Sequence, residues 1–321
     1  MEQSPRSNER EASPKTYYTK KLRKLVGEQH PSIQINDSAY TVASELLGQA
    51  YERYGRVNTS EYKAYHNDTH GYDVIDRSLK ILAVFDASVP EKIHLHDYEL
   101  LLIAAAGHDS WFNKDRDSEL SDEEASARLT AELMKQFGYP ELDTVKVNNA
   151  IIATTTEHSE HGIIQSRLHE RTPSPITLAL AMGDINATTM EGTSRIISDI
   201  PTLLAETQKL ELNASLPLKI TQLLLLQQSF ASDRLNTIHD DLRHFFNEDE
   251  TRAIQTELRN NYRKRGRELL SLTEYISHHS EEIQAKLHEL LTTPTTVGTY
   301  SIIELVQGAL KHILTSRTHK S

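Results

Sequence analysis

The sequence predicts an all-α protein, and three observations support this class. Glycine (12) and proline (10) are scarce among the 321 residues. Apolar side chains recur every three or four residues in many segments, which is the spacing of one face of an α-helix. The strict alternation of apolar and polar residues that marks a half-buried β-strand is hard to find. We therefore expect about eight to twelve helices along the chain.

The helical segments can be followed in chain order. The amphipathic ones are residues 38–54, 123–137, 218–230, 269–278 and 281–291. The first of them carries its apolar stripe on Tyr40, Ala43, Leu46, Leu47, Ala50 and Tyr54. Two other segments, 100–107 and 178–183, are apolar throughout, which is typical of buried helices. Glycine and proline mark breaks at residues 138–140, 172–175 and 292–296.

Composition limits the classes of function. The chain has 46 acidic and 35 basic side chains, and its formal net charge is −11. Such a balance argues against stable binding to nucleic acid or to an anionic membrane, both of which need an excess of Lys and Arg. The absence of cysteine excludes disulfides, thiolate metal sites and cysteine nucleophiles. With 16 histidines present, imidazole and carboxylate are the ligands that a metal would find here.

The chain divides by composition into three parts. Residues 1–16 are polar and are expected to form a disordered tail. Residues 17–240 hold the motifs described below, and residues 241–321 are expected to be a C-terminal helical extension, either separate or part of the same domain. No apolar run reaches the roughly 18–20 residues that span a bilayer, and the N-terminus does not resemble a secretory signal. We therefore expect a cytoplasmic protein without membrane contact, and an oligomer is compatible with the sequence.

The most informative segment is residues 65–74, which read Tyr-His-Asn-Asp-Thr-His-Gly-Tyr-Asp-Val. His66 and His70 are four residues apart, so on a helix they share a face, and Asp73 lies nearly on the same side. Two imidazoles and a carboxylate on one face suit a metal or a proton-transfer site. Histidine pairs with this spacing are also ordinary on helix surfaces, so the pattern alone leaves both interpretations open.

Three further segments bring ionisable residues to the ends of apolar runs. Residues 100–107 lead into His108-Asp109, and the small residues Ala104 to Gly107 would let another helix approach closely. Residues 178–183 lead into Asp184, and residues 151–157 lead into His158. Burying such groups without a partner costs several kcal/mol, roughly 2–7 for a polar group. A divalent cation is one partner that would offset this cost.

Taken together, these segments resemble the HD superfamily of metal-dependent phosphohydrolases. The order is a histidine, a His-Asp pair about 38 residues later and an aspartate about 75 residues after that. The local similarity is to the catalytic domain of class I cyclic-nucleotide phosphodiesterases, whose Tyr-His-Asn-x-x-His-x-x-Asp-Val motif is matched by Tyr65, His66, Asn67, His70, Asp73 and Val74. The resemblance covers about residues 38–240. It implies an HD-domain helical bundle with additional C-terminal helices.

The resemblance also implies roles for individual residues. One or two divalent ions (Mg, Mn, Zn or Fe) would be held by His70, His108, Asp109 and Asp184. Hydrolysis would proceed through a metal-activated water, with His66 protonating the leaving group and His158 near the second metal or the phosphate. The catalytic set is therefore His66, Asp109 and His158. Substrate contacts are expected from His66, Trp111, Asn113, Lys114 and Gln228.

Two departures from the family leave alternatives open. After His-Asp the phosphodiesterases continue with a further Asp-His pair, whereas this chain continues with Ser110 and Trp111. Their purine-gripping glutamine has its nearest counterpart in Gln227 and Gln228, which could equally pack in a core helix. The leading hypothesis is a phosphodiesterase-like hydrolase acting on a small nucleotide-like substrate. The alternatives are a nucleotidase or nucleoside-polyphosphate hydrolase, a non-catalytic nucleotide-sensing module, and a di-iron oxygenase.

Overall fold

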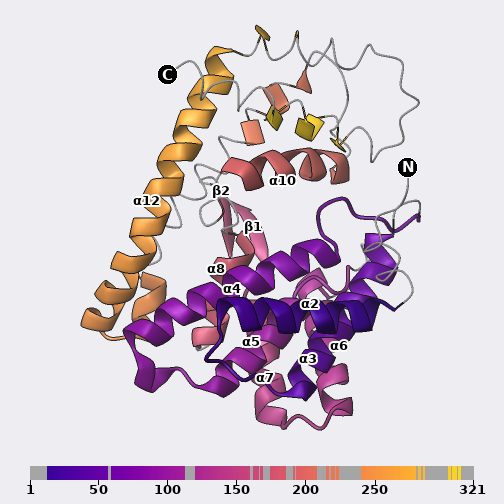
Figure 1. Ribbon diagram of the computed structural model, residues 1–321, viewed down its shortest axis with the longest axis vertical. Helices are drawn as coiled ribbons and strands as arrows, with labels where there is room; N and C mark the ends of the chain where they lie inside the picture. Colours follow the sequence, from indigo (N-terminus) through magenta and orange to yellow (C-terminus); the bar gives the residue numbers. More distant parts are fainter. Residues whose placement is uncertain are drawn as a thin grey trace. The chain divides into compact units, whose positions relative to one another are not determined.

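The computed structural model confirms the all-α class (Figure 1). It describes residues 13–56, 59–112, 120–159, 162–165, 167–168, 174–185, 191, 193–207, 215–216, 218–220, 222–223, 240–279, 281–282, 285, 303–304, 306–308 and 310–311. The α-helices are α2 (Pro14–Gln29), α3 (Asp37–Ala50), α4 (Asp68–Ser88), α5 (Leu95–Gly107), α6 (Asp122–Gln136), α7 (Glu141–Ile152), α8 (Pro175–Ile185), α10 (Thr193–Glu206) and α12 (Glu248–His278). A π-helical turn, η1 (Tyr51–Gly55), continues α3, and a short 3-10 helix, η2 (Pro90–Lys92), precedes α5.

One hairpin departs from the helical expectation. Strands β1 (Thr156–Ser159) and β2 (Gly162–Gln165) pair antiparallel, with Thr156 opposite Gln165. Helix α7 ends just before them, where the backbone bonds tighten: the amide and the hydroxyl of Thr154 both donate to the carbonyl of Ile151, at 3.0 and 2.7 Å. The β-branched residues of this segment then favour extended backbone.

The chain forms two compact units, which we describe separately. The first comprises Met1–Ile185 and Ile238–Glu257, and the second comprises Asn186–Thr237 and Leu258–Ser321. Residues 186–237 thus belong to the second unit and residues 238–257 to the first, whereas the ranges expected from the sequence are 17–240 and 241–321. Their attachment is visible in contacts: the Phe246 ring packs edge-on against Phe85 at 5.4 Å, and Lys92 Nζ lies 2.7 Å from a Glu250 carboxylate oxygen.

The predicted disordered tail, residues 1–16, includes residues that belong to a helix. Helix α2 begins at Pro14, a residue whose fixed φ and missing N–H suit the first turn of a helix. The helix is held by its buried face, which includes Tyr18 and Leu22, and the Tyr18 hydroxyl donates to the buried carboxylate of Asp68. Residues 1–12 lie outside the described residues.

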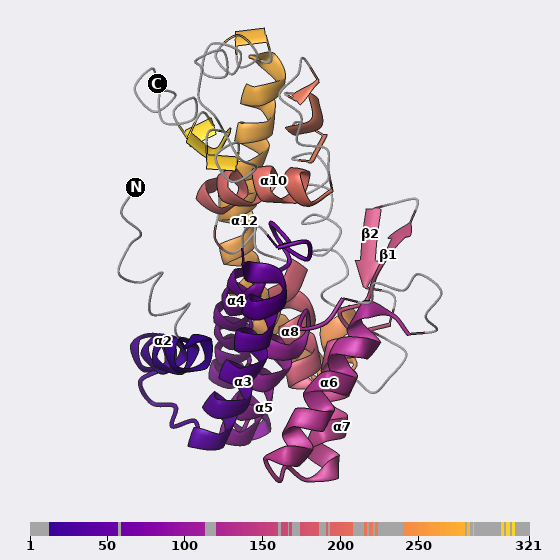
Figure 2. The same ribbon diagram turned by 90° about the vertical axis from the view of Figure 1, so that its right-hand side faces the viewer.

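Helix α5 forms the centre of the first unit. Its residues from Leu100 to Ala105 are fully buried, as expected for a helix that is apolar on all sides. It contacts α3, α4, α7 and α8, while α4 packs against α8 and α6 lies beside α7 (Figure 2). This packing brings the C-terminal end of α5 close to the start of α4 and the end of α8.

Two glycines allow the closest helix contacts. A Cβ atom on Gly107, at the end of α5, would lie 2.2 Å from Thr130 Oγ1 of α6. A Cβ atom on Gly183 of α8 would lie 2.1 Å from Ser78 Oγ of α4. Since any larger residue would push these helices apart, the glycines fix where the residues that follow them, His108 and Asp184, enter the bundle.

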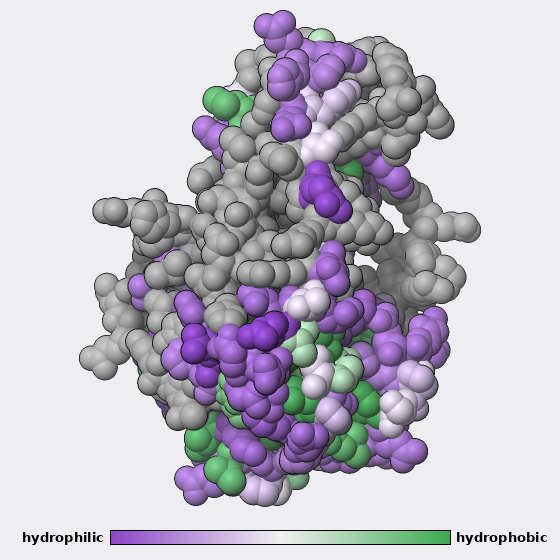
Figure 3. All heavy atoms as spheres, turned by 90° about the vertical axis from the view of Figure 1, so that its left-hand side faces the viewer, coloured by the Kyte–Doolittle hydropathy of each residue, from purple (hydrophilic) through white to green (hydrophobic). Residues whose placement is uncertain are grey.

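The described surface is mainly polar. Figure 3 shows one side of the molecule, where hydrophilic side chains cover most of the described surface and apolar side chains appear in small patches. No helix among the described residues combines the length and the apolar character needed to cross a bilayer.

Candidate metal centre

Four side chains from three helices meet at the end of the bundle. His70 lies in the first turn of α4, His108 and Asp109 follow α5 directly, and Asp184 lies near the end of α8. The Nε2 atom of His70 is 3.5 Å from Asp109 Oδ2 and 3.3 Å from Asp184 Oδ1. The Nε2 atom of His108 is 3.4 Å from each of the same two oxygens. Two imidazoles therefore face two carboxylates.

The start of α4 differs from the expected geometry. His66 is not on the helix, because the side chain of Asn67 caps it by accepting a bond from the Thr69 amide at 2.8 Å, and the helix begins at Asp68. The side-chain Nδ2 of Asn67 also donates to the carbonyl of Lys63 at 2.9 Å, which fixes the preceding turn. The turn nevertheless leaves the half-buried His66 ring 5.5 Å from the His70 ring.

The orientation of His108 is set by its backbone. Its Nδ1–H donates to the carbonyl of Ala105 at 2.8 Å, so Nε2 is the nitrogen that carries the lone pair when the ring is neutral. That Nε2 atom is buried and forms no hydrogen bond of acceptable geometry. A buried polar atom of this kind is rare in folded proteins and calls for a partner.

The spacing of the donor atoms fits a cation. Ligands about 2.1 Å from one ion are separated by about 3.4 Å in a tetrahedral site and by about 3.0 Å in an octahedral one. The four nitrogen–oxygen distances of 3.3–3.5 Å fall at the upper end of this range. Atoms of His70, His108 and Asp109 lie mutually within 4.8 Å, so this group could hold a metal ion.

Charge within the cluster is strongly coupled. Burial lowers the pKa of His70 despite the neighbouring carboxylates. Burial also acts to lower the pKa of His108, but the charges of Asp109 and Asp184 outweigh it and raise that pKa to about 9. Burial acts to raise the pKa of Asp184, yet the two imidazoles that face its carboxylate hold that pKa well below its usual range. Because a metal binds the deprotonated imidazole, a cation at His108 would compete with a proton for Nε2.

Asp184 is anchored by the helix beneath it. Arg77 of α4 is fully buried, and its Nε–H donates to the carbonyl of Gly183 at 2.6 Å. Together with the close contact between Gly183 and Ser78, this bond fixes the end of α8 against α4. The carboxylate of Asp184 consequently reaches the cluster from a rigid element.

Aromatic rings and cations line one side of the centre. The guanidinium carbon of Arg53 lies 3.4 Å from the centre of the Trp111 ring, and Lys63 Nζ lies 3.7 Å from the centre of the Phe112 ring. The Phe112 ring is in turn 5.8 Å from the ring of His66. Trp111 was expected from the sequence to contact substrate, whereas Arg53, Lys63 and Phe112 were missed because nothing local marks them.

Glu123 is a further missed residue. It is half-buried in the first turn of α6, three residues before Ser126, whose hydroxyl donates to the carbonyl of Trp111 at 2.9 Å. Burial raises the pKa of Glu123, and the negative charge of Asp109 adds to this effect. Its carboxylate therefore lies near enough to Asp109 to be affected by that charge, which its place at a helix start did not indicate.

Some expected site residues stand outside this geometry. Asn113, Lys114 and Gln228 lie outside the described residues. His158 belongs to strand β1, opposite Ile163, but its side chain is also outside the described part. Asp73 lies on α4, and neither it nor Asp184 is among the three residues whose ligand atoms lie mutually within 4.8 Å.

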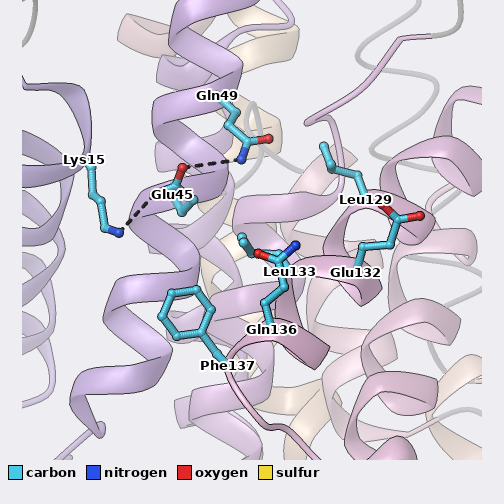
Figure 4. A pocket seen from close by; sticks show the side chains of 8 residues that line it. All are labelled: Lys15, Glu45, Gln49, Leu129, Glu132, Leu133, Gln136 and Phe137. Atoms are coloured by element: carbon cyan, nitrogen blue, oxygen red, sulfur yellow. Dashed lines mark hydrogen bonds and ion pairs between the residues drawn. The ribbon is translucent and has the colours of Figure 1, made fainter.

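A separate cavity of about 350 Å³ opens between α2, α3 and α6 (Figure 4). Lys15 and Glu45 on its wall form an ion pair at 3.1 Å, and Leu133 and Phe137 add apolar surface. None of the residues expected in the functional site lines this cavity. The paired charges offer no chemistry comparable with that of the His-Asp cluster.

Fold and site define the chain as an all-α protein with a His-Asp group that could hold a metal ion. Comparison of the chain with protein-family models, with curated proteins and with solved structures found no match. The resemblance to the HD superfamily therefore stays a prediction from the sequence motifs.

Proposed function

We propose that this protein is a metal-dependent phosphohydrolase that cleaves a nucleotide-like phosphate ester. The observation that carries the proposal is the convergence of two buried imidazoles and two carboxylates, with the His108 Nε2 atom buried and unbonded among them. Imidazole and carboxylate together suit Mg, Mn, Zn or Fe. The motif order favours a phosphodiester as substrate, as in the class that the sequence resembles.

The chain's own residues have distinct tasks in this proposal. His70, His108, Asp109 and Asp184 would hold one or two divalent ions. A bound ion supplies charge neutralisation at the phosphoryl oxygens and lowers the pKa of a coordinated water. The His70 and His108 side chains are buried, whereas Asp109 and Asp184 stay partly exposed, and the hydrogen bond from His108 to the carbonyl of Ala105 fixes the orientation of its ring.

His66 is suited to proton transfer. Its ring lies beside that of His70 but outside the group within reach of one ion, and it is half-buried. A histidine titrates near neutral pH, so it can donate a proton to a leaving alkoxide and recover it from water. The cap at Asn67 fixes the turn that carries it.

Product analysis tests the proposal. Manganese-loaded protein would be incubated with cyclic mononucleotides, cyclic dinucleotides, linear diesters and nucleoside phosphates. We expect turnover of at least one class, and a loss of at least about 100-fold with Asp109→Ala. Asp249→Ala removes a carboxylate that is 94% exposed and should leave turnover unchanged.

Two results would contradict the proposal. Absence of turnover across the panel by protein with bound metal would favour a nucleotide-sensing module. Tightly bound iron with a visible absorption band, and oxidised products in place of phosphate esters, would favour an oxygenase.

A further inference from the structure

We propose that Arg53, stacked on Trp111 beside the metal centre, forms a subsite for a second anionic group of the substrate, such as a further phosphate. This inference rests on the proposed phosphohydrolase function and narrows its substrate class. It concerns the wall of the centre and not the metal ligands. Three observations support it. The backbone that carries the Trp111 and Phe112 rings is fixed by hydrogen bonds, Arg53 stacks on Trp111, and the ammonium group of Lys63 lies over Phe112.

The backbone that carries the two rings is held from both sides. The Trp111 amide donates to Ser126 Oγ at 3.0 Å, and the Ser126 hydroxyl donates back to the Trp111 carbonyl at 2.9 Å. On the other side, the Phe112 amide donates to the Tyr54 hydroxyl oxygen at 2.9 Å. Three hydrogen bonds thus fix the segment that follows the metal ligand Asp109, and a fixed wall is what a binding subsite requires.

Among the described residues, Arg53 has no carboxylate partner. It lies in η1, and within the described part of the chain it takes part in no ion pair, although the protein has 46 acidic side chains. Its neighbour Glu52 pairs with Arg56 instead, at 2.5 Å. Stacking on Trp111 occupies the face of the guanidinium and leaves its N–H edges to donate. That planar set of donors matches the oxygens of a phosphate.

A second cation, Lys63, lies over Phe112, the ring that is near His66. Lys63 Nζ lies over the Phe112 ring, whose other neighbours are Tyr54 at 5.1 Å and His66 at 5.8 Å between ring centres. The rings of Trp111 and Phe112, adjacent in the chain, thus each carry a cation, Arg53 on the first and Lys63 on the second. A substrate whose reacting phosphoryl group sits at the metal centre would place a neighbouring anionic group against these cations.

A binding experiment isolates this subsite from catalysis. Trp111 is the only tryptophan in the chain, so intrinsic tryptophan fluorescence reports on this wall alone. Inorganic pyrophosphate would be titrated into the full-length protein in Mg²⁺, at constant ionic strength. We expect a saturable change, with an affinity at least about 10-fold weaker for Arg53→Gln. Arg128→Gln, whose parent side chain is 73% exposed, is the matched control and should bind like the wild type.

Arg53→Lys separates charge from geometry. It keeps the positive charge but loses the planar donors and the stacking, so an affinity between wild type and Arg53→Gln is expected. Thermal unfolding of each variant shows whether it is folded. If Arg53 only braced the Trp111 ring, Arg53→Gln would change the unfolding temperature and leave the pyrophosphate affinity unchanged, which would overturn the inference.

A kinetic arm distinguishes the two proposals. For Arg53→Gln we expect kcat/KM to fall at least about 10-fold for nucleoside polyphosphates and to stay within about 2-fold for bis(p-nitrophenyl) phosphate, which has no second anion. Equal losses for both substrates would overturn the subsite while leaving the hydrolase intact. Arg53-dependent pyrophosphate binding without any turnover would leave the subsite and overturn the hydrolase.

Discussion

Helix α5 carries a His-Asp dipeptide at each end, and the two ends differ in every respect that matters for binding. His96-Asp97 lies in its first turn and His108-Asp109 follows its last. Both histidines contact two carboxylates, and the sequence offers the same two residue types in the same order. The structure nevertheless makes one of them a closed structural cluster and the other a candidate metal centre.

At the first end both ring nitrogens of His96 and the carboxylate of Asp97 have partners. His96 Nδ1 lies 3.0 Å from Glu99 and Nε2 lies 2.9 Å from Asp143, so both ring nitrogens are engaged. Asp97 turns away and accepts a bond from the His94 amide at 2.8 Å, as part of a capping box. The His96 side chain is 46% exposed, and water can complete whatever the protein leaves open.

At the second end a buried ring nitrogen lacks a hydrogen bond. The His108 side chain is 1% exposed, its Nδ1 is engaged, and its Nε2 faces two carboxylates without a hydrogen bond. The comparison teaches that a His-Asp dipeptide does not define a site by itself. Burial together with an unsatisfied nitrogen distinguishes the end that can hold a cation from the end that is already complete.

The largest expected effect separates the two ends by metal affinity. His108→Ala should weaken Mn²⁺ binding by more than about 100-fold, because it removes a ligand from a buried site. His96→Ala, at the other end, should change that affinity by less than about 3-fold. Isothermal titration calorimetry on protein freed of metal measures both. Equal losses for the two variants would contradict the assignment.

A smaller effect is expected from the packing that fixes the centre. Gly183→Ala would place a methyl group 2.1 Å from Ser78 Oγ, and overpacking of this kind costs about 1–3 kcal/mol. The unfolding temperature should fall by about 3–10 °C, with weaker Mn²⁺ binding because Asp184 moves. Gly27→Ala has no atom within 4 Å of the new Cβ and lies in α2, so it should be neutral or slightly stabilising. Calorimetric unfolding of both variants makes the comparison, and a neutral Gly183→Ala would show that α8 is not fixed by this contact.

The smallest expected effect is on how the stability of a His96 variant depends on pH. Burial acts to lower the pKa of His96, but its hydrogen bonds to Glu99 and Asp143 outweigh this and raise the pKa above its usual value near 6.5. A raised folded pKa adds stability that is fully present below about pH 6.5 and is lost as the pH rises through the folded value. His96→Gln should therefore be less stable than the wild type at pH 5.5 and closer to it at pH 8.5. The difference should stay below about 1 kcal/mol because the ring is exposed. Thermal melts across this range would reveal a pH-independent difference if the ion pairs contributed nothing.

Much of the architecture was predictable from local patterns. Helical spacing predicted the all-α class, and the apolar run 100–107 predicted the buried α5, because periodicity reports directly which faces leave water. The hairpin at Thr156–Gln165 was missed because its strands are only four residues long, too short for a period to emerge. The helical placement of His66 was wrong because a cap at Asn67 outweighed the four-residue spacing.

The sequence by itself determined the residue types and their order: imidazoles and carboxylates at the ends of apolar helices, in a chain without cysteine. Those choices limit the chemistry, since they name the ligands that a metal could find. Only the tertiary structure decided which His-Asp pair is buried with an unbonded ring nitrogen, and that Arg53 and Lys63 lie over the two aromatic rings that follow it. The physical reason is that burial and unmet hydrogen bonding arise where distant helices pack, and Gly107 and Gly183 set how closely they do so.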